Sequence, residues 1–291
     1  MSELTQRTID MSILMRTRTR LRDIQIVRTA KVFRVFGGTR YGRWLIEGAG
    51  RTRFGATILG WMLGYRRSFR TLDAAERAVK PYARGGHENP ENAAWHLKRA
   101  AETSDYAAFY YLRDRLLCVR KIFDLGGNVG NLYYCYRDYL PLREDVIWTV
   151  YDLPENVSRG RTLASTRNAQ NLQFTDDLRQ AGGVDLFIAS GSLHYFDKSL
   201  PELIENIDQR PKYILINRTP LTEGPDFAIV QDAGHLRVAC MLYNRSKLIA
   251  DFKRLGYGVL GEWKVAELGV PVPDRPSSTV GAYTGLWLEH L

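Results

Sequence analysis

The stretch most suited to chemistry is an apolar run that ends in an acid and a cluster of glycines. Residues 121–133 read Lys-Ile-Phe-Asp-Leu-Gly-Gly-Asn-Val-Gly-Asn-Leu-Tyr. Glycine lets a backbone turn sharply and approach a ligand closely, and the start of the helix expected next offers unpaired N–H groups. The stretch therefore predicts a strand-to-helix turn that binds a nucleotide-like cofactor.

The spacing within this turn distinguishes two classes of cofactor. The dinucleotide fingerprint has glycines at its first, third and sixth positions, and counting from Gly126 places Asn128 third and Asn131 sixth. Counting from the acid gives Asp-x-Gly-x-x-x-Gly, the spacing of S-adenosylmethionine enzymes, in which the acid takes up the methionine ammonium directly or through water. We expect S-adenosyl-L-methionine to contact Asp124, Gly126, Gly127, Asn128 and Gly130.

A second acid ends the next apolar run, at residues 146–152. A carboxylate at Asp152 can accept hydrogen bonds from both ribose hydroxyls of a nucleoside. This feature alone does not separate S-adenosylmethionine from NAD, and Asp152 also suits the start of the helix that Leu153 and Pro154 predict. We expect Asp152 and Leu153 to contact the cofactor.

Two later runs end in small or polar residues. Thr175 and Asp176 follow the short run 172–174, where the adenine edge is expected; capping of the next helix is the alternative. Ser190 and Gly191 end the run 184–190 in a turn of small residues. Ligands of parallel sheets bind at the carboxyl ends of the strands, so this turn is expected beside the transferable methyl group.

Three residues are candidates for the transfer step. Methyl transfer mainly requires alignment of the acceptor and exclusion of water, but a general base helps when the acceptor is a hydroxyl, and histidine suits that role near neutral pH. His194, just beyond the run 184–190, is the first candidate and His235 the second, although a lone histidine is more often structural. Arg218 is expected either to grip a phosphate or carboxylate of the substrate or to brace loops.

The elements that position these residues form a repeating pattern after residue 120. Apolar runs rich in β-branched residues alternate with helical stretches, which indicates a parallel sheet with covering helices. The last two runs have no helix between them and predict a terminal hairpin. We therefore expect an α/β fold, a Rossmann-like doubly wound sheet of the class I methyltransferase type with a C-terminal β-hairpin. The seven runs are residues 121–125, 146–152, 172–174, 184–190, 213–217, 259–265 and 280–289.

Residues 1–85 are expected to form a basic helical N-terminal region, with residues 86–291 as the methyltransferase domain. Residues 1–70 hold 15 Lys and Arg against 4 Asp and Glu, so this part carries +11 and the remainder about −2 of the net +9. Residues 12–36 mix basic and apolar residues as a basic amphipathic helix does. That helix either packs with a solvated face or makes peripheral contact with an anionic membrane.

The composition excludes several other classes of protein. The three cysteines are widely spaced without a Cys-x-x-Cys pair, so no disulfide framework or metal site is expected. No secretory signal and no apolar stretch of about 20 residues is present, which predicts a cytoplasmic protein that is at most peripheral at the inner membrane face. The base-methylation motif Asn-Pro-Pro-Tyr does not follow the run 184–190, and no nucleic-acid partner is expected.

Several of these segments together resemble bacterial methyltransferases that are often encoded with polysaccharide or O-antigen biosynthesis genes. The resemblance spans roughly residues 60–265, and its most specific parts are the double-glycine turn and Asn-Arg-Thr-Pro at residues 217–220. It implies a cytoplasmic class I methyltransferase whose small-molecule or glycan acceptor is a sugar or glycan precursor that is methylated on oxygen. Its other segments are residues 64–65, 104–106, 151–154, 190–195 and 256–257.

Two other functions are alternatives to a methyltransferase. An NAD-dependent nucleotide-sugar oxidoreductase would share the strand, the glycine turn and the second acid, but the glycine spacing disfavours it. A methyltransferase-like scaffold without catalytic activity, held at a membrane by the basic N-terminal region, would account for the charge and for the uncertain base.

Overall fold

The computed structural model describes isolated positions between residues 45 and 58, and residues 68–79, 87–88, 90–97, 100–232, 237–270, 272 and 275–291. The segment 12–36 and the candidate base His235 lie outside the described residues. The boundary expected near residue 85 stays a prediction.

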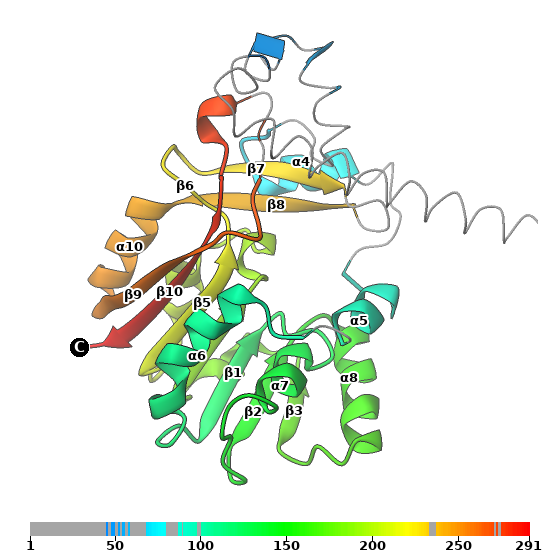
Figure 1. Ribbon diagram of the computed structural model, residues 1–291, viewed down its shortest axis with the longest axis vertical. Coiled ribbons are helices and arrows are strands. Elements are labelled where there is room, and N and C mark those ends of the chain that lie inside the picture. The colour runs from blue at the N-terminus through cyan, green and yellow to red at the C-terminus, as the bar shows by residue number, and fades with distance from the viewer. Residues whose placement is uncertain are drawn as a thin grey trace, which may run out of the picture.

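The centre of the protein is a seven-stranded sheet in the order β3-β2-β1-β4-β5-β10-β9 (Figure 1). The strands β1 to β5 pair in parallel, whereas β10 is antiparallel to both β5 and β9. This order, with one reversed strand beside β5, confirms the predicted class I methyltransferase sheet. The bounds are β1 Lys121–Leu125, β2 Ile147–Tyr151, β3 Leu172–Thr175, β4 Leu186–Ser190, β5 Tyr213–Thr219, β9 Tyr257–Val265 and β10 Tyr283–His290.

Each of the seven predicted runs overlaps one strand of this sheet. The inner strands are continuous apolar runs because helices cover both of their faces. On one face the side chains of Ile122 and Trp148 pack with those of α6, α7 and α8. On the other, Phe123 and Phe187 pack with α9 and α10. The helices are α5 Pro90–His96, α6 Thr103–Arg115, α7 Asn131–Tyr136, α8 Pro154–Thr166, α9 Leu200–Ile204 and α10 Arg245–Arg254.

The terminal hairpin is confirmed, and its close packing depends on small residues. The strands β9 and β10 pair from Val265 opposite Tyr283 to Tyr257 opposite His290. Gly285 leaves room for the indole of Trp263, since a Cβ at this position would overlap the ring. Trp263 in turn stacks on Tyr111 of α6, at 5.6 Å between ring centroids. The hairpin thus extends the sheet and helps to hold α6 against it.

A second, three-stranded sheet in the order β6-β8-β7 was not predicted. It consists of β6 Leu221–Thr222, β7 Phe227–Asp232 and β8 Arg237–Asn244, all between β5 and α10. In Figure 1, β7 and β8 cross above the main sheet with helix α4, Leu72–Val79, beside them. Phe69 adds an antiparallel bridge to Ala228 at the edge of β7.

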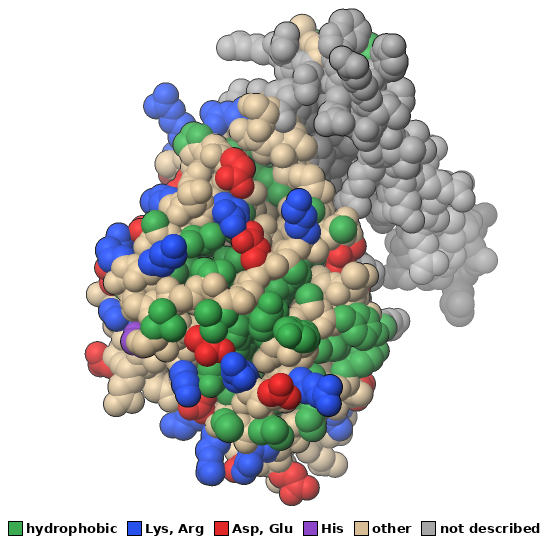
Figure 2. Space-filling view, turned by 60° about the vertical axis from the view of Figure 1, so that its left-hand side comes forward, with side chains coloured by type: hydrophobic (Ala, Val, Ile, Leu, Met, Phe, Trp, Pro, Cys, Tyr) green, Lys and Arg blue, Asp and Glu red, His purple; other side chains and the backbone are tan. Residues whose placement is uncertain are grey.

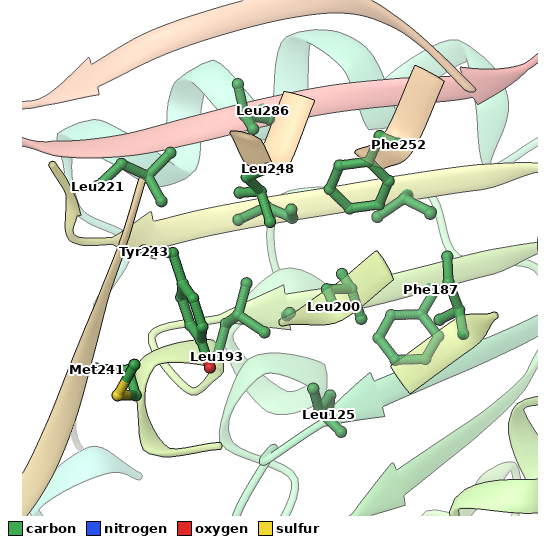
Figure 3. Packing of buried hydrophobic residues seen from close by; sticks show 14 of the residues in the cluster. Leu125, Phe187, Leu193, Leu200, Leu221, Met241, Tyr243, Leu248, Phe252 and Leu286 are labelled. Atoms are coloured by element: carbon green, nitrogen blue, oxygen red, sulfur yellow. The ribbon is translucent and has the colours of Figure 1, made fainter. Parts of the chain in front are cut away.

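The second sheet is anchored on the turn that follows β4. Figure 3 shows Met241 and Tyr243 of β8 on the same side of the core as Leu193 and Leu125. The hydroxyl of Tyr243 donates a hydrogen bond to the carbonyl of Phe196. This packing fixes β8 beside the short 3-10 helix η3, Leu193–Tyr195, at the carboxyl end of β4.

The face of the protein shown in Figure 2 has Lys and Arg side chains interspersed with Asp and Glu side chains. The excess of positive charge in the sequence falls in residues 1–70, most of which lie outside the described part of the chain. Within the described residues, no helix combines the length and the apolar character needed to cross a membrane.

Candidate functional site

The glycine turn after β1 has a backbone that side chains would obstruct. Gly126 and Gly130 have φ values of 69° and 89°, in the left-handed region that glycine adopts without strain. A Cβ at Gly126 would also lie 2.5 Å from the Cβ of Ser192, and a Cβ at Gly127 would overlap the carboxylate of Asp124. The turn therefore brings main chain, without side chains, to the carboxyl end of β1.

The same turn is joined to the end of β2 by main-chain hydrogen bonds. Asn128 also has a positive φ, 56°, and its N–H donates to Oδ2 of Asp152 at 2.7 Å. The N–H of Gly126 donates to the carbonyl of Tyr151 at 2.8 Å. The structure thus brings together the cofactor residues that the sequence predicts on these two strands.

Asp152 accepts hydrogen bonds on both carboxylate oxygens. Beside Asn128, the N–H of Leu153 and Nδ2 of Asn156 donate to Oδ1 at 2.8 and 2.7 Å. The residue preceding α8 is Leu153, whose side chain is exposed, with Pro154 in the first turn. A carboxylate offers about four acceptor sites, so three donors leave Asp152 able to accept one more hydrogen bond.

Asp124 lies beneath the turn in an unusual environment for a carboxyl group. Its side chain is 2% exposed, and the only hydrogen bond recorded for it within the described residues comes from Nε1 of Trp148 at 3.2 Å. Burial raises the pKa of Asp124 to about 7; the hydrogen bond from Trp148 opposes this shift only in part, and the nearby negative charge of Asp152 adds to it. No cationic side chain pairs with Asp124 in the described part of the chain. A cation that reached this carboxyl would favour its ionised form.

The carboxyl ends of β4 and β5 meet at Ser190 and Arg218. Nη1 of Arg218 donates to Oγ of Ser190 at 3.0 Å. Gly191 and Arg218 both have positive φ, 74° and 54°, and such a conformation in a non-glycine residue is strained. The N–H of Gly191 donates to the carbonyl of Asn217 at 2.9 Å. The turn at Ser190 and Gly191, which the sequence predicts beside the methyl group, is therefore hydrogen-bonded to β5.

The guanidinium of Arg218 is engaged inside the protein. Nη2 donates to Oδ2 of Asp105 on α6, and the side chains of this pair are 5% and 1% exposed. Oδ1 of Asp105 accepts from the hydroxyl of Tyr136 at 2.9 Å. Nε of Arg218 lies 3.6 Å from a carboxylate oxygen of Glu102. Arg218 braces α6 against the sheet in this structure, and a grip on substrate by the same group stays a prediction.

His194 lies in η3, three residues beyond Gly191. It is 3% exposed, and its Nδ1 is buried without a hydrogen-bond partner among the described residues. Burial lowers the pKa of His194 to about 3, with a smaller contribution from His87. Its ring contacts that of Tyr195 at 4.1 Å between centroids. The imidazole is neutral near pH 7, and its role as a base stays a prediction.

The end of β3 carries the two residues predicted at the adenine edge. Thr175 is buried, and its Oγ1 accepts from the N–H of Asp177 at 3.0 Å. Asp176 is exposed, whereas Asp177 precedes the 3-10 helix η2, Leu178–Ala181, and accepts from the N–H of Arg179. Capping, the alternative considered for Asp176, is thus carried out by its neighbour. A contact between Asp176 and a ligand stays a prediction.

Several residues at this end of the sheet escaped sequence reasoning. Asn156 could have been noticed, because it follows Asp152 by one helical turn and so faces the same carboxylate. Ser192, whose Oγ donates to the carbonyl of Leu125, gave no signal beyond its place in a small-residue turn. His87 reaches the site from a distant part of the chain, so no spacing connects it to the site. Asp105 lies in the segment 104–106 of the resemblance, which assigns it no role.

Comparison with known proteins gives structural likeness alone. No protein-family model matches the chain, and no curated protein matches it. Mitomycin 7-O-methyltransferase MmcR is 14% identical to this chain, with a TM-score of 0.39. The match covers 68% of this chain and 53% of the mitomycin enzyme. The N-terminal domain of EvdMO1, solved with SAH, is 15% identical, with coverages of 65% and 80% and a TM-score of 0.41. Protein PH0226 from Pyrococcus horikoshii is 15% identical, with coverages of 74% and 98% and a TM-score of 0.44.

This chain spans about half the length of the mitomycin enzyme, 53%. These likenesses are too distant to support a statement about chemistry.

Proposed function

We propose that this protein is an S-adenosylmethionine-dependent methyltransferase that methylates an oxygen of a small-molecule or glycan acceptor. The observation that carries the proposal is Asp124, a buried carboxyl group beneath a glycine turn, for which the described residues offer no cationic partner. A buried charge without a partner is costly. The ammonium group of the methionine moiety would compensate it.

The remaining residues of the turn suit the other parts of this cofactor. Asp152 has acceptor capacity left for a ribose hydroxyl. Gly126 and Gly127 leave space where a side chain would collide with Ser192 or Asp124. The switch from β1 towards β2 on one side and β4 on the other is where doubly wound sheets bind their ligands.

The bound cofactor would supply a methyl group on a positively charged sulfur. The role of the protein would be to orient an acceptor oxygen in line with that methyl group and to exclude water. Ser190 and Gly191 are the proposed wall on the methyl side, held by Arg218. His194 is a base for the acceptor hydroxyl only if its neutral imidazole takes a proton, which its low pKa opposes.

The class of acceptor rests on the sequence resemblance to enzymes encoded with polysaccharide genes. Peripheral membrane contact through residues 12–36 is likewise a proposal, supported by their basic amphipathic sequence. The acceptor class and the membrane contact are both compatible with a cytoplasmic protein that modifies a precursor in the cytoplasm or at the inner membrane face.

Isothermal titration calorimetry of the full chain tests the cofactor. We expect S-adenosylmethionine and S-adenosylhomocysteine to bind and NAD to give no heat. Binding of NAD alone would replace the proposal with a nicotinamide-dependent oxidoreductase. Failure of all three ligands to bind would favour a scaffold. Once binding is shown, transfer of a radiolabelled methyl group to sugar and glycan acceptors tests the acceptor class.

A further inference from the structure

His87 lies across the carboxyl end of the main sheet. Its carbonyl accepts a hydrogen bond from Nδ2 of Asn156 at 3.2 Å, beside the end of β2. Its ring contacts the ring of Tyr195, just past the end of β4, at 4.1 Å between centroids. Because β1 lies between β2 and β4 in the sheet, a residue that touches both ends spans the end of β1. The glycine turn leaves β1 at this same end of the sheet.

Two side chains of α8 hold this segment in place. Asn156 is fully buried, and its Nδ2 donates both to the carbonyl of His87 and, at 2.7 Å, to Oδ1 of Asp152. Nη1 of Arg159 donates to the carbonyl of Glu88 and to Oδ1 of Asn156. We name residues 87 and 88 the strap. The side-chain amide of Asn156 thus holds both the strap and the carboxylate of Asp152.

The strap brings an unpartnered polar atom to this place. Nε2 of His87 is buried and has no hydrogen-bond partner among the described residues. Nδ1 of His194, whose ring also contacts that of Tyr195, is likewise buried without a hydrogen-bond partner among the described residues. Buried polar atoms are almost always hydrogen-bonded in native proteins, because an unmade bond is costly. Such atoms beside a switch point indicate a ligand that completes them.

Charge around His87 differs from that around His194. Burial lowers the pKa of His87, but the carboxylates of Asp152 and Glu88 act against that effect. His194 has no carboxylate acting in this way, and the charge of His87 lowers its pKa further. A neutral imidazole near Asp152 can either donate a hydrogen bond or accept one at Nε2. It is therefore suited to a hydroxyl group, which can do both.

We propose that the strap is the outer wall of the cofactor site and that Nε2 of His87 hydrogen-bonds the ribose side of the bound cofactor. Asn156 is the positioning residue, since it sets the strap and Asp152 at once. This inference rests on the proposed function for the identity of the ligand. It adds to that function a binding residue from a part of the chain far from the glycine turn.

The test uses the full chain and S-adenosylhomocysteine, with affinity measured by calorimetry. We expect His87→Ala to weaken binding about five- to tenfold, the value of one neutral hydrogen bond. His87→Gln, which keeps a hydrogen-bonding group, should recover part of this loss. Asn156→Ala should weaken binding at least tenfold. His290→Ala and Thr162→Ala, an exposed histidine and an exposed residue of α8, are the matched controls and should bind as the wild type does.

Two further measurements distinguish this role from a structural one. In NMR spectra of the wild type, the His87 imidazole nitrogens should shift when S-adenosylhomocysteine is added. Hydrogen exchange at residues 87 and 88 should slow on addition of the ligand in the wild type but not in Asn156→Ala. Because the loss of the fully buried Asn156 side chain could also disturb folding, Arg159→Ala serves as a second variant, which releases Glu88 and keeps the Asn156 side chain.

Each outcome decides part of the proposal. If His87→Ala binds as tightly as the wild type and the imidazole does not shift, the contact is wrong. If Asn156→Ala and Arg159→Ala leave exchange at the strap unchanged without ligand, the positioning role is wrong. If the wild type binds neither S-adenosylhomocysteine nor S-adenosylmethionine, the proposed function fails and the His87 contact fails with it. Exchange in the ligand-free variants still decides whether α8 holds the strap.

Discussion

At the scale of single residues, the protonation state of Asp124 should make the affinity for the proposed cofactor depend on pH. Its pKa of about 7 belongs to the free protein, and the ionised form is the one that would bind an ammonium group. Below pH 7 the carboxyl group must lose a proton before it binds, so affinity should fall about tenfold for each pH unit. Calorimetry with S-adenosylhomocysteine between pH 5.5 and 8.5 checks this, and an affinity independent of pH would contradict the assignment.

Replacement of Asp124 separates binding from stability. Asp124→Asn should lower the affinity for S-adenosylhomocysteine more than tenfold, since it removes the charge opposite the ammonium group. At pH 8 the same change should not lower the thermal midpoint, because the wild type then buries an uncompensated charge. Asp145→Asn, on the exposed side of the protein, is the control and should change neither quantity.

The buried imidazole of His194 should make the folded protein less stable in acid. Its folded-state pKa of about 3 lies below the ordinary value of 6.5, so the unfolded chain binds the extra proton between these values. The free energy of unfolding should therefore fall as the pH drops from 6.5, by about 3 kcal/mol at pH 4. His194→Leu should remove this part of the acid dependence, as measured by urea unfolding. An equally steep dependence in the variant would show that the imidazole is not buried as described.

Single residues were predictable where they end an apolar run. Asp124, Asp152 and Ser190 follow such runs, and the parallel sheet then brings them to one edge. Asp105 and His87 were not predictable, because they meet the site only through folding: Asp105 is 113 positions from Arg218 in the sequence. Local spacing carries no information about contacts of that separation.

At the scale of elements, the ion pair between Arg218 and Asp105 joins α6 to the end of β5. Loss of one partner from a buried pair leaves the other charge uncompensated, which costs about 3–5 kcal/mol. Arg218→Met and Asp105→Leu should each destabilise the protein by this order, and the double variant by much less than their sum. Denaturant unfolding measures the cycle. The exposed pair between Arg143 and Asp145 is the control, and its loss should have little effect.

The elements themselves were largely predictable, with the second sheet as the exception. The five parallel strands of the main sheet are short runs with Ile, Val, Phe or Leu, a composition that indicates buried strands. Strand β8 reads Arg-Val-Ala-Cys-Met-Leu-Tyr-Asn, with a single β-branched residue. Its faces pack into two different hydrophobic clusters, so it shows neither alternation nor β-branched enrichment. It is a strand through its pairing with β7 and β6, which no local pattern announces.

At the scale of the whole molecule, the excess positive charge and the proposed cofactor site are separated along the sequence. Residues 1–70 carry +11 and the remainder −2, which gives the net +9. The proposed cofactor residues are His87 and residues beyond 120, all outside the basic segment. A basic segment binds anionic lipid through charges that salt screens. A membrane role for this segment would therefore act independently of the cofactor site.

Removal of residues 1–50 tests that separation. The shortened protein should keep the affinity of the full chain for S-adenosylhomocysteine, because Asp124 and Asp152 and the residues that hold them are retained. Sedimentation with vesicles that contain phosphatidylserine should fall, whereas the full chain should sediment at low salt and be released as salt is raised. Vesicles of phosphatidylcholine alone are the control. Equal sedimentation of both proteins would assign any membrane contact to the rest of the chain, and a loss of cofactor affinity would show that the basic segment also supports the cofactor site.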